Sequence, residues 1–150
     1  MIVLDTTVLV YAVGTDHPFR EPCRRLVEAT ESRAIDARIT VEVLQEFIHV
    51  RARGRDREDA IARGRSYLTL LGPLLVPDEG HLREAMTIYG TCSRIGMFDA
   101  VLAAVAIGAG ASLVSADRGF GEVGGLDHVV PTSEAVARLV GAAAGGSISV

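Results

Sequence analysis

The sequence predicts a single α/β domain in which a short, mainly parallel central sheet is covered by helices on both faces. Two observations predict this class: short apolar runs alternate with longer segments of helical periodicity, and turn-forming or polar residues punctuate them. With 49% apolar and 23% charged residues, the composition is that of an ordinary globular protein. We expect one domain over residues 1–142 and a loose tail over 143–150.

The first 40 residues predict two strands and two helices. The expected elements are a strand over 1–5, a helix over 6–14, a helix over 17–32 and a strand over 34–40. Thr6 or Thr7 is expected to cap the first helix and Gly14 to end it. Apolar residues at helical spacing, among them Cys23 and Leu26, predict that the second helix is amphipathic.

The middle of the chain predicts three helices and one short strand. The expected elements are helices over 41–53, 56–71 and 81–96 and a strand over 74–80 closed by Pro77. Thr40 and Asp56 are the expected caps of the first two helices, since a carboxylate suits the N-terminal end of a helix. The residues expected to face the core are Val43, Leu44, Phe47, Ile48 and Val50 in the first helix, and Leu82, Met86 and Ile88 or Tyr89 in the last.

The last third predicts a buried helix over 98–108, strands over 111–117 and 128–131, and a helix over 132–143 capped by Thr132 or Ser133. The stretch between Asp99 and Asp117 carries no charge. It contains two glycines and is shorter than the roughly 20 apolar residues that a membrane span requires. We therefore expect a buried helix and strand, and no membrane segment.

Charge and cysteine content narrow the function classes. The net charge of −4 argues against a generic nucleic-acid binder, yet all 15 basic residues are arginine and several lie in the run 51–57. This run is either a solvated helix surface or a rim that contacts phosphates, because arginine matches phosphate geometry. The two cysteines are far apart, which favours free thiols, and no secretory signal is visible. A cytoplasmic location is the expectation.

Four acidic residues stand in unusual positions. Asp5 and Asp117 follow predicted strands, Asp99 opens the most apolar helix, and Glu46 lies on an otherwise hydrophobic helix. Each alone could be a cap, a turn residue or a surface group. Gathered at one sheet edge they would repel one another, and hard divalent cations such as Mg²⁺ or Mn²⁺ would offset that repulsion. The cluster is therefore a candidate one- or two-metal site for phosphoester hydrolysis.

Other acidic or phosphate-binding sites fit less well. Receiver domains and P-loop enzymes need a lysine, and the chain has none. Dehalogenase-type phosphatases have Asp-x-Asp after the first strand, whereas this chain has Asp5, Thr6 and Thr7. No Gly-x-Ser-x-Gly elbow is present, and the four histidines show no metal-ligand spacing.

The segments "IVLDTTVLVYA", "VLQEFIHV", "FDAVLAAVAI" and "LVSADRGF" resemble, in order and spacing, the motifs of PIN-domain nucleases, particularly the VapC-type toxins of bacterial toxin–antitoxin pairs. The resemblance extends over residues 1–131. It implies a three-layer α/β/α PIN-like domain. It also implies an endoribonuclease that depends on Mg²⁺ or Mn²⁺ and leaves a 5′-phosphate and a 3′-hydroxyl.

The resemblance assigns roles to particular residues. The implied catalytic acids are Asp5, Glu46, Asp99 and Asp117, of which Asp5, Asp99 and Asp117 are the implied metal ligands. Thr7 and Ser115 match polar positions that support the acids. Glu42 shares a helix face with Glu46, but the spacing to "VLQEF" favours Glu46.

The resemblance also implies partners. Arg51, Arg53, Arg55 and Arg118 are candidates for RNA binding, and the arginines of 51–65 could equally meet a VapB-type antitoxin. A homodimer is implied as well. The alternatives are a PIN nuclease of RNA maturation or DNA, and a catalytically silent module that binds RNA or a partner.

Overall fold

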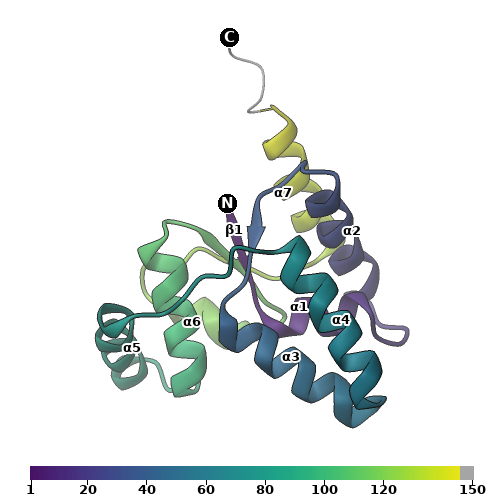
Figure 1. The fold of residues 1–150 in the computed structure, drawn as a ribbon. Helices are drawn as coiled ribbons and strands as arrows, with labels where there is room; N and C mark the ends of the chain where they lie inside the picture. Colours follow the sequence, from purple (N-terminus) through teal and green to yellow (C-terminus); the bar gives the residue numbers. More distant parts are fainter. Residues whose placement is uncertain (146–150) are drawn as a thin grey trace.

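Four parallel strands form the central sheet of the computed structural model, which describes residues 1–145 (Figure 1). The strands are β1 (Ile2–Leu4), β2 (Ala37–Arg38), β3 (Ser112–Val114) and β4 (His128–Val129), in the order β2-β1-β3-β4. Each neighbouring pair is parallel, so the carboxyl ends of all four strands meet at one edge. The predicted α/β class is confirmed.

The register of β1 and β3 decides which residues leave the sheet together. Leu4 pairs with Val114, and both side chains are fully buried. The amide of Asp5 continues the pairing by donating to the carbonyl of Val114 at 3.0 Å. Asp5 and Ser115 therefore emerge side by side at the carboxyl edge of the sheet.

Helices cover both sides of the strands. They are α1 (Thr6–Ala12), α2 (Arg20–Glu31), α3 (Val41–Gly54), α4 (Arg57–Leu70), α5 (Glu79–Thr91), α6 (Met97–Gly108) and α7 (Ser133–Gly145), with a 3₁₀ helix η1 (Arg118–Glu122) after β3. Helices α2 and α7 pack together on one side of the sheet, and α5 and α6 on the other (Figure 1). Helices α3 and α4 form a hairpin that contacts α1 through α3. Alanines on α6 are buried, which lets this helix approach β3 closely.

The helix caps are mostly as predicted. Thr40 and Asp56 cap α3 and α4, and Thr132 accepts from the amide of Ala135 at 3.2 Å at the start of α7. The prediction of Thr6 or Thr7 as the cap of α1 is wrong. Asp5 is the cap, because its backbone is extended and its carboxylate turns back toward the amide of Thr7.

The predicted strand over 74–80 is wrong. Only Leu75 pairs, through an isolated parallel bridge to Thr40. Its amide donates to the carbonyl of Ile39 at 2.9 Å. Pro73 and Pro77 have no amide proton to donate, so the pairing does not extend in either direction.

The apolar face of α5 also differs from the prediction. Ile88 is buried, as predicted, and Ala85 is buried as well, whereas Leu82, Met86 and Tyr89 are 45%, 54% and 53% exposed. Because α5 packs mainly against α6, which is rich in alanine, the small Ala85 faces inward and the larger side chains lie outside. In α3 the predicted face is correct for Val43, Leu44 and Phe47, but Val50 is exposed.

Both cysteines are buried free thiols, as predicted, and burial raises the pKa of Cys23 to about 12. Within residues 1–145, no helix combines the length and apolar character needed to cross a bilayer. The last helix continues to Gly145, and the remainder of the expected tail, 146–150, lies outside the described residues.

Phe47 anchors α3 and should be a major source of stability. Its side chain is fully buried and meets Tyr67 edge-on, with 5.0 Å between ring centroids. We expect Phe47→Ala to lower the free energy of unfolding by about 3–5 kcal/mol in a urea titration, because it leaves a cavity. Leu68→Ala, at an exposed position on α4, should change it by no more than about 0.5 kcal/mol. Equal losses in the two variants would contradict this assignment of the core.

Candidate active site

The ends of β1 and β3 are joined by side-chain hydrogen bonds. The hydroxyl of Ser115 donates to Oδ2 of Asp5 at 2.7 Å, and the hydroxyl of Thr7 donates to the same oxygen at 2.7 Å. Ser115 is fully buried and Asp5 is 6% exposed. Within residues 1–145, Oδ1 of Asp5 accepts no hydrogen bond, so this oxygen is available to a ligand.

Asp117 is held at the same edge by its backbone and its neighbours. Its amide donates to the Ser115 hydroxyl at 3.0 Å, and its Oδ1 caps η1 by accepting from the amide of Gly119 at 2.8 Å. The amide of Ala116 donates to the Thr7 hydroxyl at 3.1 Å. Thr7 and Ser115 thus link Asp5 to the segment that carries Asp117.

A close backbone approach brings Asp117 toward the start of α6. A Cβ atom on Gly119 would lie only 2.7 Å from the carbonyl oxygen of Arg94 and 3.1 Å from Cγ2 of Ile95. A glycine is therefore required for η1 to lie against the loop that leads into α6. Asp99 is the third residue of α6, and its carboxylate accepts a 3.2 Å hydrogen bond from the amide of Gly96, the N-cap of this helix.

The electrostatics of Asp99 show that the four acids share one region. Burial raises the pKa of Asp99 above its ordinary value, and the charges of Asp5, Asp117 and Glu46 raise it further. The hydrogen bond from Gly96 opposes this shift and does not overcome it. The ionised form of Asp99 is therefore destabilised by its surroundings, which a bound cation would reverse.

Glu46 reaches the cluster from α3. Its Oε2 accepts a 2.6 Å hydrogen bond from the hydroxyl of Thr6, the first residue of α1. Glu42 is exposed, whereas the charge of Glu46 raises the pKa of Asp99. Of the two glutamates left open by the sequence, Glu46 is the one that lies with the aspartates.

The donor set suits a hydrated hard cation better than an enclosed one. Within residues 1–145, no three His, Cys, Asp or Glu side chains are arranged so that they could hold one metal ion together. Mg²⁺ commonly keeps several waters and takes one or two carboxylates from the protein. Asp5, with Oδ1 available, and Asp99, with a destabilised charge, fit that mode of binding.

Sequence reasoning did not identify two residues that touch the site. Thr6 binds Glu46, and Nε2 of His128 lies 3.0 Å from the carbonyl oxygen of Ser115. Both contacts join segments distant in the chain, and no local pattern marks them. The adjacency of Thr6 to Asp5 was the only available signal.

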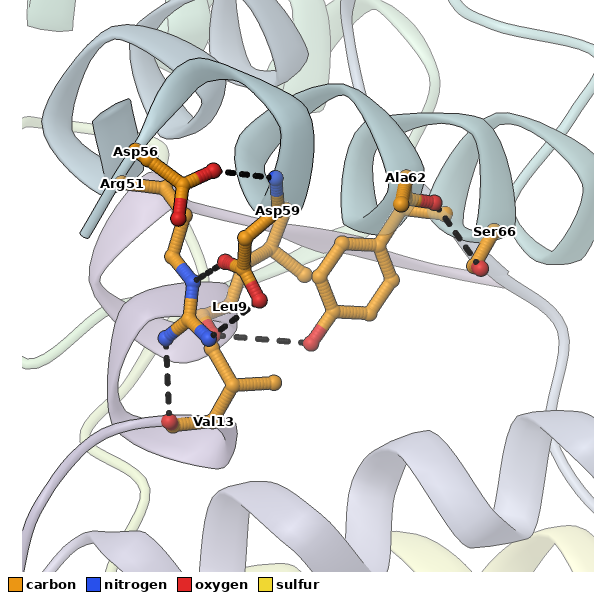
Figure 2. A network of polar contacts seen from close by, with 8 residues as sticks. Leu9, Val13, Arg51, Asp56, Asp59, Ala62 and Ser66 are labelled. Carbon is orange, nitrogen blue, oxygen red and sulfur yellow. Dashed lines mark hydrogen bonds and ion pairs between the residues drawn. The ribbon is translucent and has the colours of Figure 1, made fainter.

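The candidate RNA-binding arginines fall into two groups. Arg53, Arg55 and Arg118 are exposed, as a phosphate-contacting role requires. Arg51 is not free for such a contact. Its guanidinium is paired with Asp59 and also donates to the carbonyl of Val13, and its side chain is 14% exposed (Figure 2).

A parallel sheet with acids at its carboxyl edge is the arrangement of a PIN domain, and the PIN-domain family model matches residues 2–126. The chain is 48% identical over 143 residues to Ribonuclease VapC7 of Mycobacterium tuberculosis. This match covers 94% of this chain and 99% of that protein. It is 32% identical over 136 residues to Ribonuclease VapC13 of the same organism, and this match covers 86% of this chain and 99% of that protein. The chain therefore belongs to the PIN-domain family and, within it, to the VapC type.

Solved structures show the same fold. FitAcB from Neisseria gonorrhoeae matches with a TM-score of 0.70 and 20% identity over 87% of this chain and 98% of that chain. VapBC2 from Rickettsia felis, bound to a DNA fragment from its promoter, matches with a TM-score of 0.68 and 19% identity. This match covers 86% of this chain and 98% of that chain. The predicted PIN-like architecture is confirmed.

The raised pKa of Asp99 predicts how the stability of the metal-free protein depends on pH. When the pKa of a carboxyl is higher in the folded state than in the unfolded state, the protein loses stability as the pH rises from the unfolded-state pKa to the folded-state pKa. In EDTA at pH 7, Asp99→Asn should therefore have a higher Tm than the parent, and the difference should vanish below about pH 4. Thermal unfolding from pH 3.5 to 8 measures this. A lower Tm for the variant at pH 7 would show that the charge is not destabilised.

Ser115 should matter to stability because it supports a buried carboxylate. Ser115→Ala removes a donor to Asp5 and an acceptor for the amide of Asp117. We expect a loss of about 1–3 kcal/mol in the free energy of unfolding, measured by denaturant titration. Ser66→Ala is the matched control, because Ser66 is exposed and bonds only within its own helix, to Ala62. A change of about 0.5 kcal/mol or less in both variants would contradict the role of Ser115.

Proposed function

We propose that the protein is a metal-dependent endoribonuclease that acts as the toxin of a type II toxin–antitoxin pair. The observation that carries the proposal is that hydrogen bonds gather Asp5, Asp117 and Glu46 around the ends of β1 and β3, and that the charges of all three raise the pKa of Asp99. The two similar proteins described above are both named ribonucleases, and each is matched over 99% of its length. This likeness supports RNA as the substrate.

Asp5 and Asp99 would hold Mg²⁺ or Mn²⁺ together with water molecules, and Asp117 and Glu46 would contribute through water. When bound, the cation supplies Lewis acidity that activates a water and offsets charge on the scissile phosphate. Oxygen donors and the absence of any lysine in the chain suit this chemistry. The products would be a 5′-phosphate and a 3′-hydroxyl.

The chain's other residues orient the acids and the substrate. Thr7 and Ser115 fix Oδ2 of Asp5, which leaves Oδ1 directed to the reaction. Arg118 follows Asp117 directly and is exposed, so it can offset charge on the phosphate oxygens. Arg53 and Arg55 would contact the RNA backbone in a salt-dependent step.

A VapB-type antitoxin is the proposed partner, supported by the likeness in fold to the VapC-containing VapBC2 structure. We also propose a homodimer. Exposed apolar side chains on α5, namely Leu82, Met86 and Tyr89, support it, because a second copy would remove them from water. The proposed location is the cytoplasm, where RNA substrates lie.

The alternatives are less well supported. A catalytically silent module would keep mutually repelling carboxylates at a cost in stability, with no cation to offset it. A PIN nuclease of RNA maturation would use the same chemistry. Induction in cells, with growth followed and new RNA 5′ ends mapped, separates the two nucleases, because a toxin would arrest growth as it cleaves RNA.

The purified protein should cleave total bacterial RNA in Mg²⁺ or Mn²⁺ and lose this activity in EDTA. Asp5→Asn and Asp99→Asn should each lower the rate at least about a hundredfold, because a lost ligand removes several kcal/mol of transition-state stabilisation. The readout is 5′-end mapping followed by a fluorescent oligonucleotide made from a mapped site. Glu134→Gln, on the exposed face of α7, is the control. Cleavage by the two Asn variants at the parental rate would contradict the proposed site.

A further inference from the structure

Arg51 joins three helices through one guanidinium group. Nε donates to Oδ2 of Asp59 at 2.5 Å and Nη2 to Oδ1 at 3.2 Å, which makes a two-point ion pair between α3 and the first turn of α4. Nη1 donates to the carbonyl of Val13 at 3.3 Å (Figure 2). Val13 is the C-cap of α1, so Arg51 satisfies a carbonyl at the negative end of that helix.

The same two helices, α1 and α3, meet again at the active site. The hydroxyl of Thr6 at the start of α1 donates to Glu46 on α3, five residues before Arg51. Helix α1 is therefore bonded to α3 at both ends, by Thr6 to Glu46 and by Val13 to Arg51. Among residues 1–145 these are the two polar bonds that join α1 and its cap to α3.

Glu46 depends on this arrangement for its position. It is exposed and has a long flexible side chain, so apolar packing does not hold its carboxylate. Phe47, its neighbour, is buried and anchors α3 to the core. The two polar bonds at opposite ends of α1 add fixed points between the two helices, on either side of Phe47.

The pKa shifts of Arg51 and Asp59 are those expected of a stable ion pair. The hydrogen bond from Arg51 lowers the pKa of Asp59 below its ordinary value, and Asp59 in turn raises the pKa of Arg51. Asp56, the cap of α4, accepts from the amide of Asp59 at 2.8 Å and keeps that carboxylate at the start of the helix.

We infer that Arg51 is a positioning residue of the active site: paired with Asp59, it holds α3 against the end of α1 so that Thr6 can fix Glu46 beside the aspartates. This inference rests on the proposed nuclease function for its catalytic consequence. It replaces the expectation from sequence that Arg51 binds RNA.

Steady-state cleavage of the labelled oligonucleotide separates positioning from RNA binding. Arg51→Met should lower kcat by about five- to a hundredfold and leave KM within about twofold, since small misplacements of a reacting group have effects of this size. Arg51→Lys keeps the charge but not the two-point pair, so its kcat should lie between that of the parent and that of Arg51→Met. Arg53→Met, at an exposed position proposed to bind RNA, should instead raise KM.

Two further variants keep the test decisive. Asp59→Asn weakens the pair without deleting the arginine and should lower kcat in the same direction, which covers the case in which Arg51→Met does not fold. Arg138→Met removes the arginine of an exposed pair with Glu134 on α7 and should leave kcat and KM unchanged. A rise in KM with kcat retained, or no difference between Arg51→Met and Arg138→Met, would overturn the inference.

A thermal double-mutant cycle tests the coupling without any enzymatic activity. Thr6→Val removes the donor to Glu46, and its effect on Tm should be smaller in the Arg51→Met background than in the parent, because the Thr6 contact is already weakened there. Equal Tm losses in both backgrounds would show that the two ends of α1 are independent and would overturn the inference. If the parent cleaves no RNA while the cycle shows coupling, the proposed function fails and the structural link stands.

Discussion

Asp5 is 6% exposed, and burying a charge of this kind costs several kcal/mol unless hydrogen bonds or a cation compensate. The protein supplies hydroxyl donors from two segments, Thr7 on α1 and Ser115 after β3, and both meet one oxygen of the carboxylate. The pairing of β1 with β3 makes this possible, because Leu4 and Val114 are opposite one another and the next residue of each strand is polar. The other elements of the site are arranged around this contact.

The remaining acids come from three other elements. Asp117 caps η1, Asp99 bonds to the start of α6, and Glu46 extends from α3. None of them forms an ion pair within the described residues, so their mutual repulsion is not relieved by the protein's own cations. Fifteen arginines are present, yet the arginines that form ion pairs in the described residues pair with other carboxylates. A cation from solution, as proposed above, would relieve this repulsion.

The sequence was informative where a residue's role follows from its own element. Asp5 and Asp117 end apolar runs and Asp99 opens an apolar helix, so their place at the carboxyl edge follows from α/β topology. The contacts of Thr6 and His128 could not be found this way, because each depends on packing between segments far apart. The error on α5 has a related cause. Helical spacing identified an apolar stripe, but the alanine-rich partner α6 accommodates the small Ala85 and leaves Leu82 and Met86 outside.

Gly119 contributes no functional group, yet it sets how closely two acids approach. Its missing side chain allows η1 to touch the carbonyl of Arg94, and thereby brings the element that follows Asp117 against the loop that precedes Asp99. Coulomb energy varies inversely with distance, so a shift of this contact changes the repulsion between the acids and the attraction that a cation experiences. In this fold the affinity of the proposed metal site could therefore be adjusted by the distance of one backbone contact, with every proposed ligand left unchanged.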